Sequence, residues 1–264
     1  MAFRIATLSD VGIKRKVNQD SLRYAVAETG RGHAFMAVVC DGMGGLAEGE
    51  VASSKVADSF VQWFHEHFLL MAENDIKEQE LQRELTELVL TQNQELIAYG
   101  KSKGIQAGTT VSAIFIANHK YYTVHVGDSR IYGLTDRMLL LLTNDHSVVA
   151  EEVRQGILTE EQAQQDRRRN ILTQCVGVRQ QVVPEFADGA IEGSVSFLLC
   201  SDGFVHKISG KEIFQFCNPK ICNRTPKMKQ TIAEMVELLK NRKETDNISV
   251  VLLRVDRKKG GIIE

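Results

Sequence analysis

The chain has 264 residues, of which 43% are hydrophobic and 25% charged, so it can bury the core of one large domain. Its net charge of -2 and pI near 6.4 provide no general attraction to nucleic acid or anionic membranes, so any ligand must be recognised by a local site. The N-terminus lacks a signal-peptide core, and no uncharged apolar run approaches the roughly 20 residues of a spanning helix. We therefore expect a cytoplasmic protein without nucleic-acid or membrane partners.

Runs of β-branched and large apolar residues predict strands, and apolar residues at helical spacing predict helices. The expected strands are, in chain order, 34–40, 110–117, 120–127, 129–134, 137–142, 195–201 and 248–255. Between the first two strands, helical spacing over 56–68 and again over 81–96 predicts two long helices. Another amphipathic helix is expected around 232–239, before the last strand.

The helices fall in blocks and do not alternate with single strands. The strands between residues 110 and 142 are separated by a few residues, which suits hairpins and excludes parallel crossovers of a dozen or more. We therefore expect an α+β protein whose sheet structure is largely antiparallel. No proline-rich linker divides the chain, so one domain is expected over 1–255, followed by a C-terminal tail, 256–264.

Aspartates recur at the ends of the expected strands. Asp41, Asp128 and Asp202 follow strands 34–40, 120–127 and 195–201, whereas Asp246 precedes strand 248–255. Asp246 can reach the same sheet edge only if its strand runs antiparallel to the others. The antiparallel arrangement and a cluster of these carboxylates are therefore mutually consistent.

Such a cluster requires a cation, because two unit charges about 4 Å apart repel by about 4 kcal/mol at an effective dielectric constant near 20. In sequence, no lysine or histidine recurs beside these aspartates, and ligation by oxygen alone favours Mg²⁺ or Mn²⁺ over zinc. The pattern predicts a site for hard divalent ions. The alternative is that each aspartate caps a turn, which is the common role of Asp beside Gly.

The segment "VVCDGMGG", residues 38–45, also permits a dinucleotide-binding site. Gly42, Gly44 and Ala47 satisfy the relaxed pattern GxGxx(G/A) after a strand. However, Asp41 would repel the pyrophosphate, and no strand with an acidic end follows about 20 residues later. The chain also lacks the nucleotide-binding motif GxxxxGK(S/T) and the nucleophile motif GxSxG, which disfavours those classes of site.

Segments along nearly the whole chain resemble the metal-dependent serine/threonine protein phosphatases of the PPM, or type 2C, family in its bacterial form. They occur in the family's order: "SDVGIKRKVNQD" (9–20), "VVCDGMGG" (38–45), "AGTTVSAIF" (107–115), "VGDSRIY" (126–132), "LTNDHS" (142–147), "NILTQCVG" (170–177), "LLCSDG" (198–203) and "TDNISVVLL" (245–253). The resemblance implies a four-layer αββα sandwich, with two central antiparallel sheets flanked by pairs of helices.

The resemblance also implies an active site with two Mn²⁺ or Mg²⁺ ions and a weaker third. Asp41 would bridge the two ions, the Gly42 carbonyl would ligate one, and Asp202 and Asp246 would complete the shell of the other. Asp128, with Asp202, would bind the third ion. A hydroxide bridging two ions would attack the phosphorus of phosphoserine or phosphothreonine directly.

Two further residues have roles implied by the family motif RxxNxD. Arg15 would bind the substrate phosphate through its planar fork, and Asp20 would orient metal-bound water. Phosphorylated proteins, including a serine/threonine kinase, are the expected partners. The sequence alone leaves two alternatives: a weakly active or inactive scaffold of the same fold, and a hydrolase of another phosphoester.

The chain departs from the family pattern near the expected site. Gln19 replaces the usual Glu, and Met43 and Leu46 occupy positions that are often His. The usual proton donor to the leaving serine or threonine is thus missing, and His146, His33 or a metal-bound water are substitutes. Residues 147–169 resemble the mobile flap of bacterial members, whose charged side chains we expect to select phosphoprotein substrates.

Overall fold

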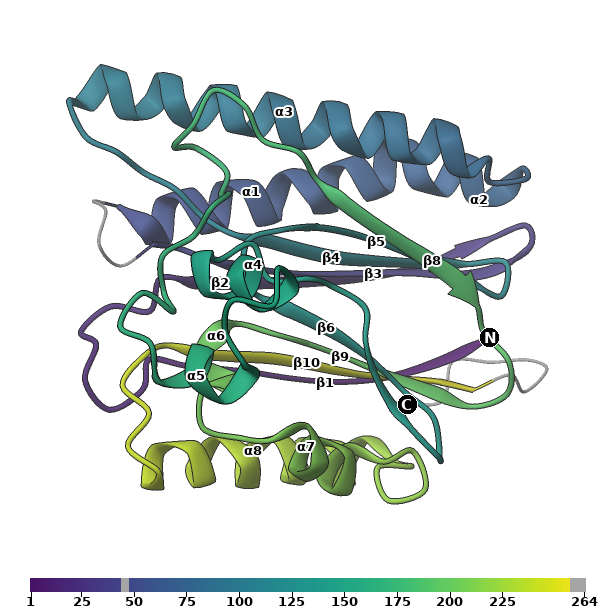
Figure 1. Ribbon diagram of the computed structural model, residues 1–264. Helices are drawn as coiled ribbons and strands as arrows, with labels where there is room; N and C mark the ends of the chain where they lie inside the picture. Colours follow the sequence, from purple (N-terminus) through teal and green to yellow (C-terminus); the bar gives the residue numbers. More distant parts are fainter. Residues whose placement is uncertain (44–47, 257–264) are drawn as a thin grey trace.

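The computed structural model describes residues 1–43 and 48–256 and contains two five-stranded sheets stacked face to face (Figure 1). The sheets have the strand orders β1-β10-β9-β6-β7 and β2-β3-β4-β5-β8, and all neighbouring strands pair antiparallel. The strands are β1 (Ala2–Asp10), β2 (Asp20–Thr29), β3 (Gly32–Asp41), β4 (Val111–Ala117), β5 (Lys120–Val126), β6 (Arg130–Leu134), β7 (Leu139–Leu141), β8 (Glu185–Ala190), β9 (Val195–Cys200) and β10 (Ile248–Asp256).

Helices cover both outer faces of the pair of sheets, which completes the expected αββα sandwich (Figure 1). One face carries α1 (Gly49–Trp63), which continues through a π-helical turn, η1 (Phe64–Phe68), into α2 (Leu69–Glu73), and also α3 (Glu78–Lys103). The other face carries α7 (Gly210–Cys217) and α8 (Thr225–Asn241). None of the helices in the described residues combines the length and apolar character needed to cross a membrane.

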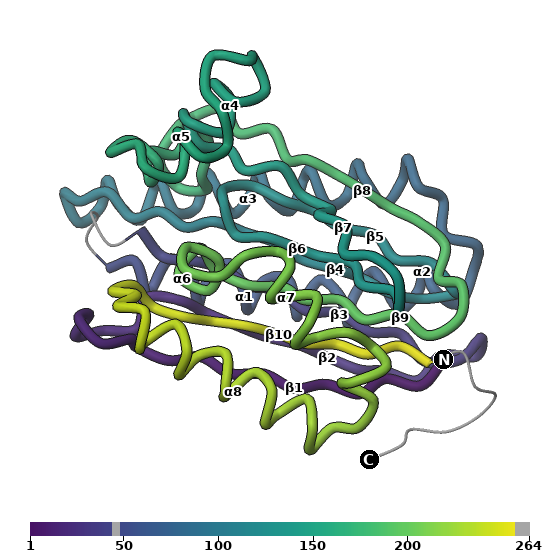
Figure 2. Tube along the Cα trace, turned by 60° about the horizontal axis from the view of Figure 1, so that its bottom comes forward, coloured from purple at the N-terminus to yellow at the C-terminus, as the bar shows by residue number. Residues whose placement is uncertain are grey.

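The short helices lie at one end of the sandwich. α6 (Asp202–Val205) directly follows β9, whereas α4 (Val148–Arg154) and α5 (Glu160–Gln165) belong to the segment 147–169. Figure 2 shows α4 and α5 standing away from the two sheets. α5 begins with a capping box, in which Thr159 and Gln162 satisfy each other's backbone N–H groups. The segment expected to be a flap therefore has a structure of its own.

Three apolar layers hold the sandwich together. The first lies between the α1 and α3 layer and its sheet and includes Phe60, Phe64 and Phe115. The second lies between the sheets, and the third joins α7 and α8 to the other sheet. Because the inner face of each sheet is covered by the other sheet and the outer face by helices, β3, β4 and β10 are apolar over almost their whole length.

All the strands expected from sequence are confirmed, within a few residues at their ends. The strands that the sequence patterns missed are β1, β2 and β8, and each is an edge strand. An edge strand needs fewer apolar residues because it has one neighbour and is partly exposed to water. Its sequence therefore gives a weaker strand pattern than that of a central strand.

The chain changes sheets between β5 and β6, whereas short gaps had predicted a hairpin there. The β4–β5 and β6–β7 hairpins are confirmed, but β6 pairs with β9 and β7. Gly127, between β5 and β6, has a φ of +116°, and a Cβ there would lie 2.5 Å from the Thr110 side chain. This glycine turn directs the chain out of one sheet and into the other.

Candidate active site

The antiparallel strands bring the predicted aspartates to one end of both sheets. Asp41, at the end of β3, lies opposite Asp20, at the start of β2. Asp202 follows β9, and Asp246 immediately precedes β10, which runs antiparallel to β9. The strand direction that Asp246 requires is therefore present. Asp128 follows β5 and contributes to the same electrostatic environment, since its charge acts on Asp41.

Burial and mutual repulsion disfavour the ionised forms of these carboxyl groups. Burial, together with the charges of Asp202 and Asp246, raises the pKa of Asp20 to about 7. Burial and neighbouring carboxylates also raise the pKa values of Asp41 and Asp128 well above their usual range. A buried group of like charges with raised pKa values attracts cations and is typical of functional sites.

Two oxygen atoms of the cluster have no hydrogen-bond partner among residues 1–43 and 48–256. Asp20 accepts a hydrogen bond from Ser201 Oγ through Oδ2 at 2.8 Å, but its buried Oδ1 accepts none. Oδ1 of Asp202 is also buried and unpaired. An unsatisfied buried group costs roughly 1–3 kcal/mol, and more when it is charged. Because oxygen ligands are those that Mg²⁺ and Mn²⁺ prefer, these residues fit a hard divalent cation.

Arg15 lies beside the cluster but is paired with Asp246. Its Nε and Nη2 donate to the two carboxylate oxygens of Asp246 at 2.9 and 2.7 Å. The hydrogen bond to Asp246 is the main cause of the raised pKa of Arg15, although burial opposes it, and Asp41 and Asp202 add to the effect. Arg15 and Asp246 thus lie together beside the cluster, while their roles in binding phosphate and metal stay predictions.

Asn247 fixes the loop that carries Arg15 against the segment that carries Asp246. Its Nδ2 donates to the carbonyl oxygens of Val11 and Val17 at 2.9 and 3.2 Å. Its Oδ1 accepts a hydrogen bond from the backbone N–H of Gln19 at 2.9 Å. Sequence reasoning assigned no role to Asn247, although it belongs to the quoted segment "TDNISVVLL". We assign it the positioning of this loop.

Gly42 has a structural reason to be glycine. A Cβ at this position would lie 2.2 Å from the Gly49 carbonyl oxygen and 2.6 Å from that of Gln19. Gly42 is therefore packed closely against the backbone of Gly49 and Gln19. Ligation of a metal by the Gly42 carbonyl stays a prediction. The Gln19 side chain donates to Glu50 Oε2 at 3.2 Å. The other positions discussed for this loop, Gly44, Leu46 and Ala47, lie outside the described residues.

Neither histidine that could replace the usual proton donor faces the aspartates. His33 lies near the start of β3, and Asp41 at its end is eight residues away, or roughly 26 Å along a strand. His146 is buried, and its Nδ1 accepts a hydrogen bond from the N–H of Gly127 at 3.2 Å. Its Nε2 lies 3.6 Å from Glu185 Oε2. These contacts indicate a structural role for His146.

His146, His125 and Glu185 also bring possible ligand atoms within 4.8 Å of one another. However, the nitrogens of His125 already have partners, because Nδ1 lies 2.8 Å from Ser112 Oγ and Nε2 lies 3.0 Å from the Gly127 carbonyl oxygen. Burial lowers the pKa of His125 to about 4. We therefore interpret this group as a hydrogen-bonded part of the core.

A cavity of about 550 Å³ adjoins the aspartate cluster. Asp128, Asp202 and His206 line it together with side chains of the segment 147–169, among them Glu160 of α5 and Arg169, which follows α5. The segment 147–169, which was expected to be a flap, thus lines a cavity that reaches two of the predicted metal ligands. This placement gives flap side chains direct access to a molecule bound beside the cluster.

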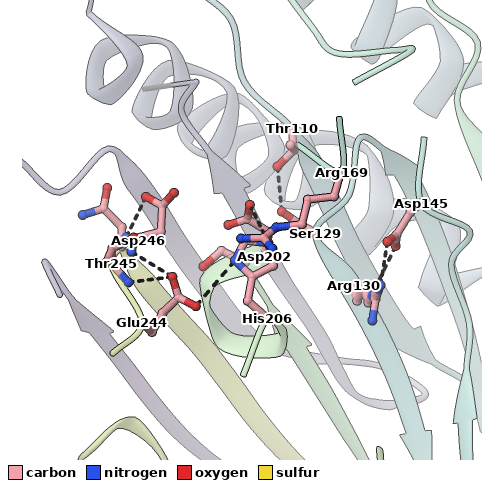
Figure 3. Close-up of polar contacts among 12 residues, drawn as sticks. Thr110, Ser129, Arg130, Asp145, Arg169, Asp202, His206, Glu244, Thr245 and Asp246 are labelled. Carbon is pink, nitrogen blue, oxygen red and sulfur yellow. Dashed lines mark hydrogen bonds and ion pairs between the residues drawn. The ribbon is translucent and has the colours of Figure 1, made fainter. Parts of the chain in front are cut away.

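His206 contacts Asp202, which corrects the expectation that no histidine recurs beside these aspartates. Nε2 of His206 lies 3.3 Å from Asp202 Oδ2, and Nδ1 lies 3.6 Å from Glu244 Oε2 (Figure 3). Burial disfavours the imidazolium, but the two carboxylates outweigh it and raise the pKa of His206. The sequence feature that could have predicted this contact is the position of His206 four residues after Asp202. This spacing places the two side chains on the same side of a helical turn.

Comparisons with known proteins agree with the fold and identify the family. A sequence model of the family described as "Protein phosphatase 2C" matches residues 13–252. The chain is 32% identical to "Protein phosphatase PhpP" of Streptococcus pneumoniae over 96% of its own length and 98% of that protein. Its structure is similar to that of the serine/threonine phosphatase Stp1 from Staphylococcus aureus, with a TM-score of 0.80, 26% identity and coverage of 97% and 96% of the two chains.

A further solved structure is the catalytic domain of the serine/threonine protein phosphatase PstP in complex with 2 manganese ions. It matches with a TM-score of 0.74, 29% identity and coverage of 96% of this chain and 99% of that one. The family match covers far more than half of the chain, and the relatives are matched over nearly their full lengths. The chain belongs to the protein phosphatase 2C family of serine/threonine protein phosphatases.

Proposed function

We propose that the protein hydrolyses phosphoserine and phosphothreonine in other proteins at the acidic end of its two sheets. The observation that carries the proposal is the convergence of aspartates from separate segments, with unpaired buried oxygens on Asp20 and Asp202 among the described residues. The similarity to serine/threonine phosphatases supports the substrate class. The partners would be phosphorylated proteins, among them a serine/threonine kinase.

The same cluster supports the binding of two Mn²⁺ or Mg²⁺ ions. Asp41, the Gly42 carbonyl, Asp202 and Asp246 would hold them, and Asp128 with Asp202 would hold a weaker third ion. When bound, divalent ions activate a water molecule for direct attack on phosphorus and offset the charge of the phosphate. The complex of PstP with 2 manganese ions supports this choice of ion.

The side chains around the cluster would position the substrate and the attacking water. The Arg15 fork can hold two phosphate oxygens in exchange for its contact with Asp246. Asp20, fixed by Ser201 through Oδ2, leaves its unpaired Oδ1 to accept a hydrogen bond from water. We assign residues 1–255 to a single domain and residues 147–169 within it to the flap. The flap lines the cavity beside the cluster, so it would contact substrate residues on either side of the phosphorylated side chain.

The test is hydrolysis of an aryl phosphate and of phosphothreonine peptides by the full chain, with Mn²⁺ or with EDTA. Wild type is compared with Asp202→Asn and with Asp188→Asn, a control at an exposed carboxylate on the edge strand β8. We expect Mn²⁺-dependent turnover in wild type and control. Asp202→Asn should lose at least about 100-fold, because it alters a ligand itself and not merely an outer contact.

Other outcomes of the same assay separate the alternatives. A wild type without Mn²⁺-dependent turnover would contradict the proposal and favour an inactive scaffold of the same fold. The features of the chain that suggest such a scaffold are the Arg15–Asp246 pair and Gln19. Turnover confined to small phosphorylated metabolites would instead favour a hydrolase of another phosphoester. Equal turnover in Asp202→Asn and wild type would show that the reaction takes place elsewhere.

A further inference from the structure

His206 and Glu244 form a polar bridge between two aspartates of the cluster. His206 contacts Asp202 Oδ2 at 3.3 Å through Nε2 and Glu244 Oε2 at 3.6 Å through Nδ1. Oε1 of Glu244 accepts hydrogen bonds from the backbone N–H groups of Thr245, at 2.7 Å, and Asp246, at 3.0 Å. Figure 3 shows this continuous path from Asp202 to the segment of Asp246.

Glu244 is buried, whereas His206 is partly exposed toward the cavity. Glu244 is 4% exposed, and the His206 side chain is 18% exposed. Burying a carboxylate is costly unless hydrogen bonds and an opposite charge compensate it. Here the backbone N–H groups bind Oε1, and His206 lies beside Oε2, which accepts no hydrogen bond among the described residues. Burial opposes ionisation of Glu244, but the contact with His206 and the hydrogen bond from the N–H of Asp246 outweigh it and lower the pKa of Glu244. Both side chains are therefore held in a defined position.

The two residues come from different parts of the chain. His206 follows α6, which begins at Asp202, and Glu244 lies in the connection between α8 and β10, two residues before Asp246. The bridge thus joins segments that each carry one of the aspartates. Because Oδ2 of Asp202 faces His206, the Oδ1 atom that is unpaired among the described residues is left for another partner.

We propose that His206 and Glu244 are positioning residues that hold Asp202 and Asp246 in the arrangement needed to bind a divalent cation. The inference rests on the proposed function, since it assumes that these aspartates ligate the metal. Side chains that orient a ligand typically contribute roughly 10–100-fold to metal affinity. The bridge therefore tunes how tightly the site holds its ion without contacting the ion itself.

Two substitutions at His206 separate its contacts. Asn carries an amide nitrogen at the position of Nδ1 and Gln carries one at the position of Nε2, so His206→Gln retains the contact to Asp202 and His206→Asn retains the contact to Glu244. Mn²⁺ binding to the full chain is measured by calorimetry, and the environment of bound Mn²⁺ by electron paramagnetic resonance. His65→Gln, at an exposed histidine of η1, is the control.

We expect His206→Asn to weaken Mn²⁺ binding by roughly 10–100-fold and to alter the resonance spectrum. His206→Gln should recover most of the affinity, and the control should match wild type. Glu244→Gln keeps the acceptor for the two backbone N–H groups but removes the charge that faces His206, so it should weaken binding as little as His206→Gln, which loses the same contact, and less than His206→Asn. Because the residues act as one unit, the double variant of His206→Asn and Glu244→Gln should lose no more than His206→Asn alone.

Each contrary result has a distinct meaning. If the Asn and Gln variants bind Mn²⁺ as wild type does, the bridge is overturned and the proposed function stands. Equal losses in both variants would overturn it as well, because a merely structural role does not distinguish the two nitrogens. Unfolding temperatures in EDTA identify a variant that fails to fold. If a His206 variant fails in this way, the Mn²⁺ affinity of Glu244→Gln tests the bridge instead. A wild type that binds no Mn²⁺ would overturn the proposed function and the inference together.

Discussion

Raising the pH from 5 to 8 should destabilise the metal-free protein, because Asp20 must then lose a proton inside the fold. In the folded protein its pKa is raised from 3.8 to about 7, mainly by burial. Between these two values the folded state holds a proton that the unfolded chain has released. The free energy of unfolding is therefore greatest below the unfolded pKa and falls as the pH rises through the folded pKa.

The size of the effect follows from the shift. Each pKa unit corresponds to about 1.36 kcal/mol, and roughly two units of the shift lie above pH 5, so Asp20 should account for on the order of 3 kcal/mol between pH 5 and 8. Asn at this position can still accept a hydrogen bond from Ser201 Oγ, so Asp20→Asn removes the titration and keeps this contact. The stability advantage of the variant over wild type should be on the order of 3 kcal/mol larger at pH 8 than at pH 5 and should vanish only below the unfolded pKa.

Urea unfolding in EDTA at several pH values measures the difference between wild type and Asp20→Asn, with Asp188→Asn as the control. Histidines titrate in both proteins, so they cancel in the difference. Adding Mn²⁺ should stabilise both proteins at pH 8, since a ligand that binds the folded state stabilises it by mass action. A difference between wild type and Asp20→Asn that stays constant or shrinks as the pH rises would refute the reasoning.

Two further substitutions test the surroundings of the cluster. Arg15→Ala should leave Mn²⁺ affinity unchanged or higher, because it frees both oxygens of Asp246. The kcat/KM for phosphopeptides should fall by roughly 10–100-fold, because a bidentate charged contact to the phosphate is lost. Weaker Mn²⁺ binding in this variant would contradict the reasoning. Gly42→Ala should lower the free energy of unfolding by about 1–3 kcal/mol through its clash with Gly49, whereas Gly30→Ala, where a Cβ meets nothing within 4 Å, should have little effect in thermal unfolding. Equal stabilities of the two alanine variants would argue against a packing role for Gly42.

The amino-acid sequence by itself determined the elements whose pattern is local. Central strands such as β4 and β10 are apolar over almost their whole length, and the helices carry apolar residues at helical spacing, so both types could be predicted. The positions of Asp41, Asp202 and Asp246 relative to strands, with an antiparallel sheet, were enough to expect their convergence. Edge strands β1, β2 and β8 were missed because half-exposed strands carry less of this pattern.

Only the tertiary structure decided which distant side chains meet. The contact of Arg15 with Asp246 joins residues 231 positions apart. His206 and Glu244, which also make contact, are separated in the sequence by α7 and α8. The change of sheet after β5 likewise depends on the packing of Gly127 against Thr110. Periodicity records which face of an element is buried, but a polar contact depends on the relative placement of two elements, which many weak packing interactions set together.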